Sequence, residues 1–284
     1  MIDFHTHSNA SDGTDTPAQV LHAAVKAGLS AVALTDHDTV SGLAEFLHAA
    51  EGVNITAVPG VEISTNLYNK EIHILGLMID PVSVELSDFL ENARRNRNAR
   101  NDLMLAKLNA IGYRVTLEEL QECARGESIG RPHVAEILVK KGYFPDVQAA
   151  FDSCLKRGGR AYVPRSQAPP AECIRVIHAA GGLAFWAHPV YRGHGERASV
   201  RRFLKVLVPA GLDGIEAFYS QFTPYQTLML GEMAEEFHIL RTGGTDYHGA
   251  IHPGIRIGAG CGELIVPDEL FELMRQKRAE KQCR

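Results

Sequence analysis

Short apolar runs alternate with amphipathic stretches at both ends of the chain. Residues 16–28 fit a helix in which Thr16 is the cap, Pro17 takes the first turn and Gly28 ends it. A second helix is predicted for residues 40–51. Strand-like segments occur near Ile2, Ala31, Ile55, Ile72, Leu183, Ile215 and Ile239. About seven strands that alternate with helices indicate a parallel α/β architecture.

This alternation stops between residues 80 and 164, where the pattern is mostly helical. Helices are predicted for residues 87–111, 116–123 and 133–141. A chain of 284 residues is suited to a single (β/α) barrel. We therefore predict one barrel built from residues 1–80 and 164–284, with residues 81–163 inserted as a helical lid.

Histidine and carboxylate side chains stand at the ends of the predicted strands. His5 and His7 are two residues apart, so on a strand both side chains point to the same face. The strand ends of a parallel barrel converge on one mouth, where such groups would meet. The candidate metal ligands are His5, His7, Asp12, His37, Glu62, His73, His188, Asp246 and His248.

This set of donors predicts a metal hydrolase. Imidazoles and carboxylates without thiolates suit Mn²⁺, Zn²⁺ or Fe²⁺ better than they suit a structural zinc site. Nine ligands are too many for one ion and about right for three. Glu62 could then bridge two of the ions.

Composition limits the class of partner and the compartment. The formal net charge of −5 argues against a surface that coats nucleic acid, although a local basic cluster could bind phosphate. The odd count of five cysteines, with no C-x-x-C pair, predicts free thiols in a reducing compartment. Neither a signal peptide nor a membrane span is recognisable, so the cytoplasm is expected. No obligate protein partner is indicated.

The predicted lid carries basic groups that suit an anion. Gly130-Arg131-Pro132-His133 precedes a helix, so backbone N–H groups, a guanidinium and an imidazole would converge at its N-terminus. Residues 156–165 add further basic groups, of which Arg165 is the last. Arg100 lies in the charged middle of the first lid helix. An ordinary helix start and solvated surfaces are the alternative interpretations.

Several motifs together resemble those of the PHP (polymerase and histidinol phosphatase) family, over nearly the whole chain. They are His5-Thr6-His7, Thr35-Asp36-His37-Asp38, Val61-Glu62, His73, Ala187-His188-Pro189 and Thr245-Asp246-Tyr247-His248. The resemblance implies a distorted seven-stranded (β/α)7 TIM-like barrel with three divalent ions, for which Mn²⁺ is expected and Fe²⁺ or Zn²⁺ are alternatives.

The resemblance also implies how the ligands are shared. The first ion would be held by His5, His7, Glu62 and Asp246, the second by Asp12, His37 and His248, and the third by Glu62, His73 and His188. Asp246 is the candidate group to orient the attacking water and accept its proton. His188 is the candidate group to stabilise the leaving oxygen.

Within this family, the lid looks most similar to small members that remove the 3′-phosphate from nucleoside 3′,5′-bisphosphates. A nucleotide substrate is therefore expected, with contacts from Asp12, His37, Arg100, Arg131, His133 and Arg165. A 5′-3′ exoribonuclease that acts on short 5′-phosphorylated RNA is the main alternative. An amidohydrolase-type barrel is less favoured because no lysine lies at a suitable strand end. A domain that has lost catalysis is disfavoured because every ligand position is filled.

Overall fold

The structure is a computed structural model that describes residues 1–123, 129–164, 166–190 and 196–283. Its sheet has seven strands, and each strand pairs with the next along the chain. The strands are β1 (Ile2–Asp3), β2 (Ala31–Leu34), β3 (Thr56–Leu67), β4 (Lys70–Leu77), β5 (Leu183–Trp186), β6 (Gly214–Tyr219) and β7 (Leu240–Gly244). Phe4 N donates to Gly243 O at 3.0 Å, and Thr6 forms a parallel bridge with Tyr247. These contacts join the two ends of the sheet, which confirms the distorted seven-stranded barrel.

The expectation of a wholly parallel sheet is wrong at β4. This strand runs antiparallel to both β3 and β5. Its connection to β3 is a turn at Tyr68 and Asn69, both with positive φ, at 54° and 59°. A two-residue turn can join only antiparallel strands, because a parallel crossover needs a dozen or more residues.

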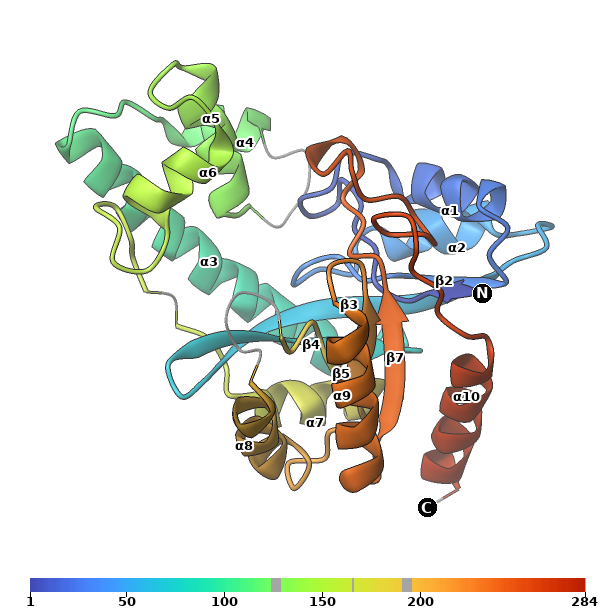
Figure 1. Cartoon of the computed structure of the whole chain (residues 1–284). Coiled ribbons are helices and arrows are strands. Elements are labelled where there is room, and N and C mark those ends of the chain that lie inside the picture. The colour runs from blue at the N-terminus through green and yellow to red at the C-terminus, as the bar shows by residue number, and fades with distance from the viewer. Residues whose placement is uncertain (124–128, 165, 191–195, 284) are drawn as a thin grey trace.

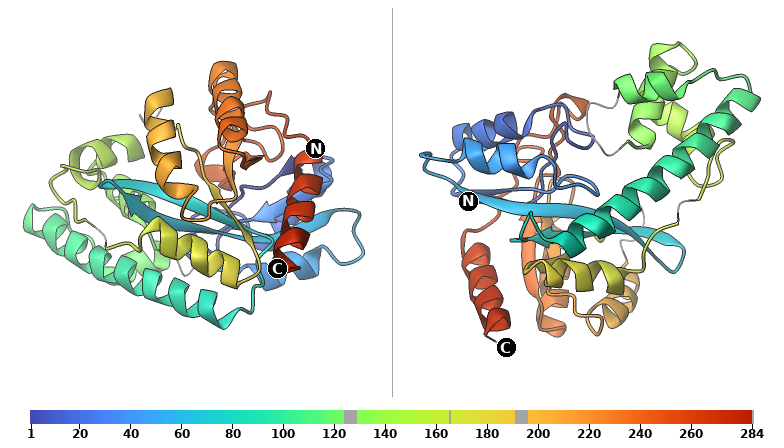
Figure 2. Two further views of the ribbon diagram at one scale, coloured as in Figure 1. Left: turned by 90° about the horizontal axis from the view of Figure 1, so that it is seen from below. Right: turned by 180° about the vertical axis from the view of Figure 1, so that it is seen from behind.

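Helices cover the outside of the barrel (Figures 1 and 2). They are α1 (Pro17–Lys26), α2 (Leu43–Ala49), α7 (Pro170–Ala179), α8 (Arg197–Leu207), α9 (Pro224–Glu236) and α10 (Glu269–Gln282). Thr16 caps α1 as predicted, since its side chain accepts from Gln19 N. The second predicted helix is confirmed but shorter at both ends than residues 40–51.

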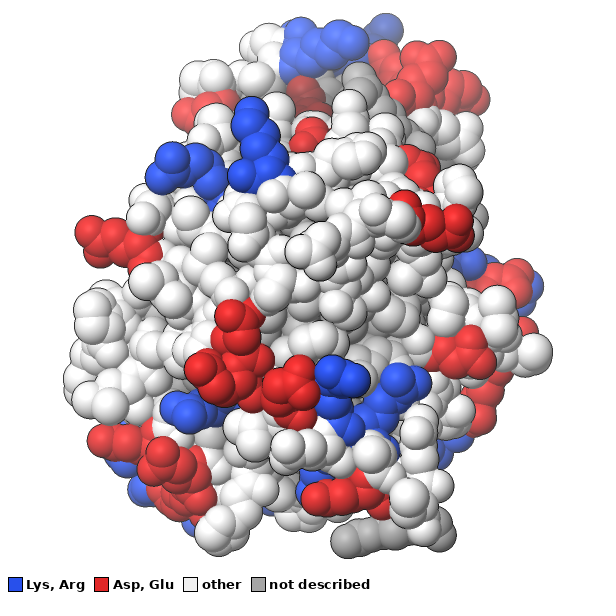
Figure 3. All heavy atoms as spheres, turned by 90° about the vertical axis from the view of Figure 1, so that its right-hand side faces the viewer, with Lys and Arg blue, Asp and Glu red and all other residues white. Residues whose placement is uncertain are grey.

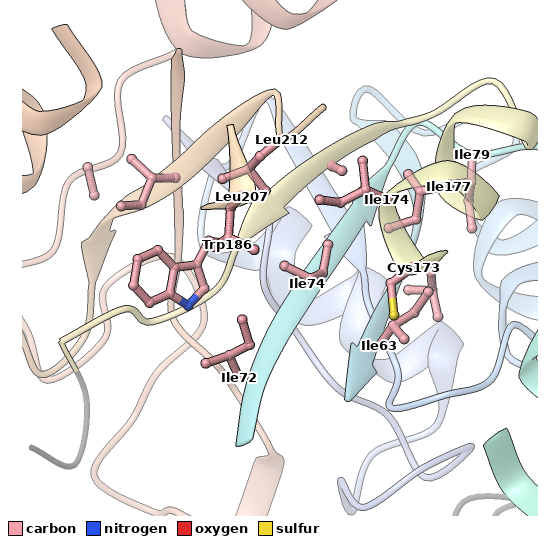
Figure 4. Packing of buried hydrophobic residues seen from close by; sticks show 14 of the residues in the cluster. Ile63, Ile72, Ile74, Ile79, Cys173, Ile174, Ile177, Trp186, Leu207 and Leu212 are labelled. Atoms are coloured by element: carbon pink, nitrogen blue, oxygen red, sulfur yellow. The ribbon is translucent and has the colours of Figure 1, made fainter. Parts of the chain in front are cut away.

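The largest part of the core lies between these helices and the strands. Trp186 of β5 stacks on Phe203 of α8, with ring centroids 5.3 Å apart. Figure 4 shows Ile174 and Ile177 of α7 packed beside Ile74 of β4. Burying such side chains stabilises the folded barrel by roughly 1.5–3 kcal/mol each. This packing fixes the strand ends that carry the predicted ligands.

Residues between β4 and α7 form a helical segment with its own apolar cluster. Its elements are α3 (Val84–Ala110), α4 (Leu117–Cys123), α5 (Arg131–Lys140), α6 (Val147–Ala150) and the π-helical turn η1 (Phe151–Leu155). The three predicted helices are thus confirmed, with α3 starting earlier because Ser83 caps it. Leu108, Val134 and Leu138 belong to a cluster separate from the barrel core. Figure 1 shows α4, α5 and α6 gathered at the outer end of α3, away from the sheet.

Surface charge and cysteine chemistry agree with the composition. Figure 3 shows one face of the molecule, on which basic and acidic side chains are interspersed rather than gathered in one band. All five cysteines are free thiols. Among the described residues, no helix is both long and apolar enough to cross a membrane.

Candidate metal centre and its surroundings

The nine predicted ligands lie together at one end of the barrel. They form overlapping groups in which the ligand atoms lie within 4.8 Å of one another. The groups are His7, Asp12, His37 and His248; His5, Glu62 and His188; His5, His7 and Asp246; and His37, Glu62 and His73. Side chains from six separated segments of the chain therefore meet at one centre.

Glu62 of β3 lies in the middle of this centre. Its side chain is fully buried, and five imidazoles surround its two carboxylate oxygens. The closest nitrogen–oxygen distances are 3.4 Å to His5, 3.3 Å to His7, 2.9 Å to His37, 2.8 Å to His73 and 3.0 Å to His188. A carboxylate in this position can reach more than one ion.

Two other carboxylates flank Glu62 on the side of His7. Asp246 Oδ1 lies 3.1 Å from His7 Nε2 and 3.4 Å from His5 Nε2. Asp12 lies 3.4 Å from His248 Nε2 and 3.8 Å from His37 Nε2. The acidic and imidazole groups thus alternate around the centre.

Unsatisfied buried atoms indicate that this set of side chains fits metal ions. His5 Nε2, both ring nitrogens of His7, His37 Nδ1 and Glu62 Oε2 are buried without a hydrogen-bond partner among the described residues. Buried polar atoms normally have partners, because leaving them unpaired costs about 1–3 kcal/mol each. Divalent ions that prefer nitrogen and oxygen donors would satisfy these atoms.

The protonation states of His7 and Glu62 suit metal binding, whereas nearby carboxylates raise the pKa values of His5, His73 and His248. Burial, together with the nearby His248 and His37, lowers the pKa of His7 to about 3, so its imidazole is neutral near pH 7. Burial alone would raise the pKa of Glu62, but the imidazoles of His37, His73 and His5 outweigh it and hold that pKa well below the ordinary value. Neutral imidazole and ionised carboxylate are the forms that bind metals.

Glu216 of β6 supports the centre from behind and was not among the predicted site residues. Its Oε1 lies 2.9 Å from His5 Nδ1, and its Oε2 accepts from His188 N at 2.6 Å. A carboxylate on the second ring nitrogen orients a metal-binding histidine and fixes its tautomer. The signal in the sequence is a single acid in the apolar strand Gly214–Tyr219, where a fully buried carboxylate needs donors.

We expect Glu216→Gln to weaken metal affinity or activity about 10- to 100-fold. Glutamine keeps the shape but has only one oxygen, so it cannot accept from both His5 and His188 N. Competition with a chelator measures the affinity, and phosphate release from an aryl phosphate measures the activity. Wild-type values for both would show that Glu216 does not position these histidines.

Buried carboxylates also hold the two loops that carry Asp246 and Asp12. Asp3 accepts from Thr245 N at 2.9 Å and from Thr245 Oγ1 at 2.7 Å. Asp36 accepts from Ser8 N at 2.8 Å and from Ser11 Oγ at 2.6 Å. Neither Asp3 nor Asp36 was predicted as a site residue.

Asp246 itself is held in a particular backbone and side-chain geometry. Its φ is 56°, in the left-handed region that aspartate tolerates better than most residues. Its N–H donates to His5 O at 2.8 Å. Tyr219 donates its hydroxyl proton to Asp246 Oδ2 at 2.7 Å, which leaves Oδ1 facing His5 and His7.

The long helix α3 reaches this centre through Arg97. The Arg97 side chain pairs with Asp38 and donates to Ser64 Oγ at 3.2 Å. Asp38 follows His37 directly, and its carboxylate also accepts from Ser64 N at 3.0 Å. Of the predicted substrate residues, Arg100 lies on the same helix and is buried.

The predicted anion site at the start of α5 has the expected helix start. Gly130 is the N-cap residue, and its N–H donates to His133 Nδ1 at 3.0 Å. Arg131 Nη2 lies 3.0 Å from Glu71 Oε2, and Glu71 Oε1 lies 3.7 Å from His73 Nε2. Arg131 therefore lies close to the metal centre, whereas the predicted Arg165 lies outside the described residues.

Comparison with known proteins agrees with this geometry. The model of the PHP domain matches residues 3–161. The 5′-3′ exoribonuclease Rnm of Escherichia coli is 34% identical over 254 residues, which are 87% of this chain and 85% of the relative. The 3′,5′-nucleoside bisphosphate phosphatase of Chromobacterium violaceum is 33% identical over 258 residues, which are 90% of each chain.

A solved structure shares the whole fold. It is a protein of Bifidobacterium adolescentis to which a metal-dependent phosphoesterase function has been assigned by inference. The two chains are 29% identical and superpose with a TM-score of 0.84, which covers 97% of this chain and 96% of that one. Matching motifs, relatives and fold lead to one conclusion: this chain belongs to the PHP-domain family.

Proposed function

We propose that this protein is a metal-dependent phosphatase that removes the 3′-phosphate from nucleoside 3′,5′-bisphosphates, leaving the 5′-monophosphate. The observation that carries the proposal is the position of Arg131. This guanidinium reaches Glu71, which in turn lies 3.7 Å from His73 at the metal centre. One phosphate can therefore react at the centre while a second, distal phosphate is held by the lid.

Three divalent ions are assigned to the centre, with Mn²⁺ expected and Fe²⁺ or Zn²⁺ as alternatives. The assignment is supported by the number of buried unpaired donors and by the central place of Glu62. When bound, such ions would lower the pKa of water and offset negative charge on the phosphate. Asp12 and His37 lie on the same side of the centre, where they would also face the substrate.

Asp246 and His188 are assigned the proton and leaving-group roles. Water would attack phosphorus in line with the 3′ oxygen, and the bond from phosphorus to that oxygen would break. Asp246 Oδ1 would take the proton of the water, because Oδ2 already accepts from Tyr219. His188, whose backbone N–H is fixed by Glu216, would stabilise the departing oxygen.

Residues 81–163 are assigned the role of a lid over this mouth. Their separate apolar cluster and the Arg97 contact with Asp38 support the assignment. Arg131, Arg100 and His133 would hold the distal 5′-phosphate, together with Arg165, which lies outside the described residues. Arginine suits this role because its planar guanidinium matches phosphate oxygens in pairs.

Arg131→Ala should raise KM for adenosine 3′,5′-bisphosphate about 10- to 100-fold and leave hydrolysis of a simple aryl phosphate unchanged. One charge-assisted phosphate contact is worth roughly 1.5–3 kcal/mol, and the aryl phosphate has no distal phosphate to lose it. Steady-state kinetics on both substrates checks this. Arg160→Ala is the matched control, because Arg160 bonds Tyr113 within the lid. Equal losses on both substrates would refute the assignment.

A second candidate function is 5′-3′ exonuclease action on short 5′-phosphorylated RNA. It is favoured by the 34% identity to the exoribonuclease of Escherichia coli. Both functions use a nucleotide substrate, and the predicted cytoplasmic setting suits both.

The two functions are separated by measuring phosphate release from adenosine 3′,5′-bisphosphate beside trimming of a short 5′-phosphorylated RNA. The protein is loaded with Mn²⁺, and His188→Ala is the inactive control. Rapid release of one phosphate with slow RNA trimming supports the phosphatase. Preferential trimming of RNA would make the protein a nuclease with a secondary phosphatase activity.

A further inference from the structure

Glu71 is an acidic residue placed where an anionic substrate would be expected. It lies on β4, two residues before His73, and its side chain is 40% exposed. Its Oε2 lies 3.0 Å from Arg131 Nη2, and its Oε1 lies 3.7 Å from His73 Nε2. One carboxylate thus links the first residue of α5 in the lid to the rim of the metal centre.

A second guanidinium lies near the same place. A Cβ atom on Gly130, the residue before Arg131, would lie only 3.4 Å from Arg97 Nη1. Arg97 Nε is buried and has no hydrogen-bond partner among the described residues. Arg97 Nη1 therefore lies beside the start of α5, next to the residue that precedes Arg131.

We propose that Glu71 is an internal substitute for the distal phosphate of the substrate. In the unliganded protein its carboxylate pairs with Arg131, and a bound distal phosphate displaces it. A phosphate carries about −1.5 to −2 charges and three acceptor oxygens, so it competes well with a single carboxylate. This inference rests on the proposed function, because it takes Arg131 as the residue that holds that phosphate.

The consequence differs between ligands that carry a distal phosphate and ligands that lack one. A neutral ribose hydroxyl cannot replace an ionised carboxylate on Arg131, so such a ligand leaves the pair with Glu71 intact. Every ligand that does bind Arg131 must first break this pair. Glu71 therefore lowers the affinity for ligands that carry a distal phosphate and leaves the binding of other ligands unchanged.

The test is the binding of adenosine 5′-monophosphate and of adenosine to metal-loaded protein, measured by calorimetry. Glu71→Gln should tighten binding of the monophosphate about two- to fivefold, the range for a half-exposed ion pair. Binding of adenosine should not change. The gain in affinity should disappear when Glu71→Gln is combined with Arg131→Ala, because Glu71 and the phosphate then no longer compete for a guanidinium.

Two controls separate this role from a structural one. Glu85→Gln removes a comparably exposed glutamate that pairs with Arg175 instead, and it should leave both affinities unchanged. Metal content per chain is measured for each variant, because Glu71 also lies near His73. Unchanged or weaker binding of the monophosphate by Glu71→Gln would overturn the proposal. A gain that persists without Arg131 would also overturn it.

Turnover of the bisphosphate separates the role of Glu71 from the phosphatase activity of the protein. If Glu71→Gln tightens the monophosphate but no variant releases phosphate from the bisphosphate, the role of Glu71 stands and the phosphatase assignment falls. If the bisphosphate is hydrolysed and its KM is the same with and without Glu71, the phosphatase stands and the role of Glu71 falls.

Discussion

Glu62→Gln should lower kcat/KM for phosphate release by at least about 10³ and reduce the bound metal. The buried carboxylate is surrounded by the imidazoles of five of the candidate ligands. Glutamine has nearly the same shape but no charge, and an amide is a poor substitute for a bridging carboxylate. Metal ions stabilise the charge of the transition state by several kcal/mol, and each 1.36 kcal/mol is a factor of ten in rate.

The measurement is steady-state turnover beside elemental analysis of the purified variant. Asp213→Asn is a matched control, because Asp213 is also a buried carboxylate but pairs with His178 and Lys281 away from the nine ligands. We expect the control to keep its metal and its turnover. Activity of Glu62→Gln within tenfold of wild type, with full metal content, would show that Glu62 is not a ligand.

Arg97→Met should lower the free energy of unfolding by about 3–5 kcal/mol. The side chain of Asp38 is fully buried and that of Arg97 is 10% exposed, so the substitution leaves a carboxylate without its counter-charge in a dry environment. The same pair fastens the long helix α3 to the segment that carries His37. Arg94 adds a hydrogen bond from its Nη1 to Asp38 O at 3.1 Å. Denaturant unfolding measures the loss.

A double variant tests the interpretation of this pair. Asp38→Asn combined with Arg97→Met removes both charges, and we expect it to recover most of the lost stability, because no buried charge remains. If the loss in free energy of unfolding of the double variant equals the sum of the two single losses, the two side chains stabilise the protein independently. In that case Arg97 would not be the electrostatic link between lid and barrel.

The meeting of the nine candidate ligands could be predicted because barrel geometry turns a sequence pattern into a spatial one. Most of the candidate ligands follow a strand, and strand ends of a barrel share one mouth. Glu62 and His73 instead lie within β3 and β4. The direction of β4 could not be predicted in the same way. Its turn uses Tyr68 and Asn69 rather than a glycine, so the usual hairpin signal is missing. His73 nevertheless reaches the centre. It pairs with Ser64 across the hairpin, and Glu62 lies two residues before Ser64 on the same face of β3.

The supporting residues could not be predicted because their roles depend on contacts between distant segments. Asp36 and Asp38 flank His37 in one motif, yet one binds the loop after His7 and the other binds Arg97. Nothing in the order of residues distinguishes them. Likewise, the middle of α3 contains several arginines, and only the packing of the helix decides that Arg94 and Arg97 contact Asp38.

The most direct test is to titrate metal-free protein with Mn²⁺ while measuring phosphate release from adenosine 3′,5′-bisphosphate. We expect no release without metal and full release as about three ions bind per chain, since one ion cannot engage all nine ligands. Glu62→Gln should bind fewer ions and stay inactive throughout. Full activity of the metal-free protein, or saturation of activity by a single ion, would contradict a shared centre built from these nine side chains.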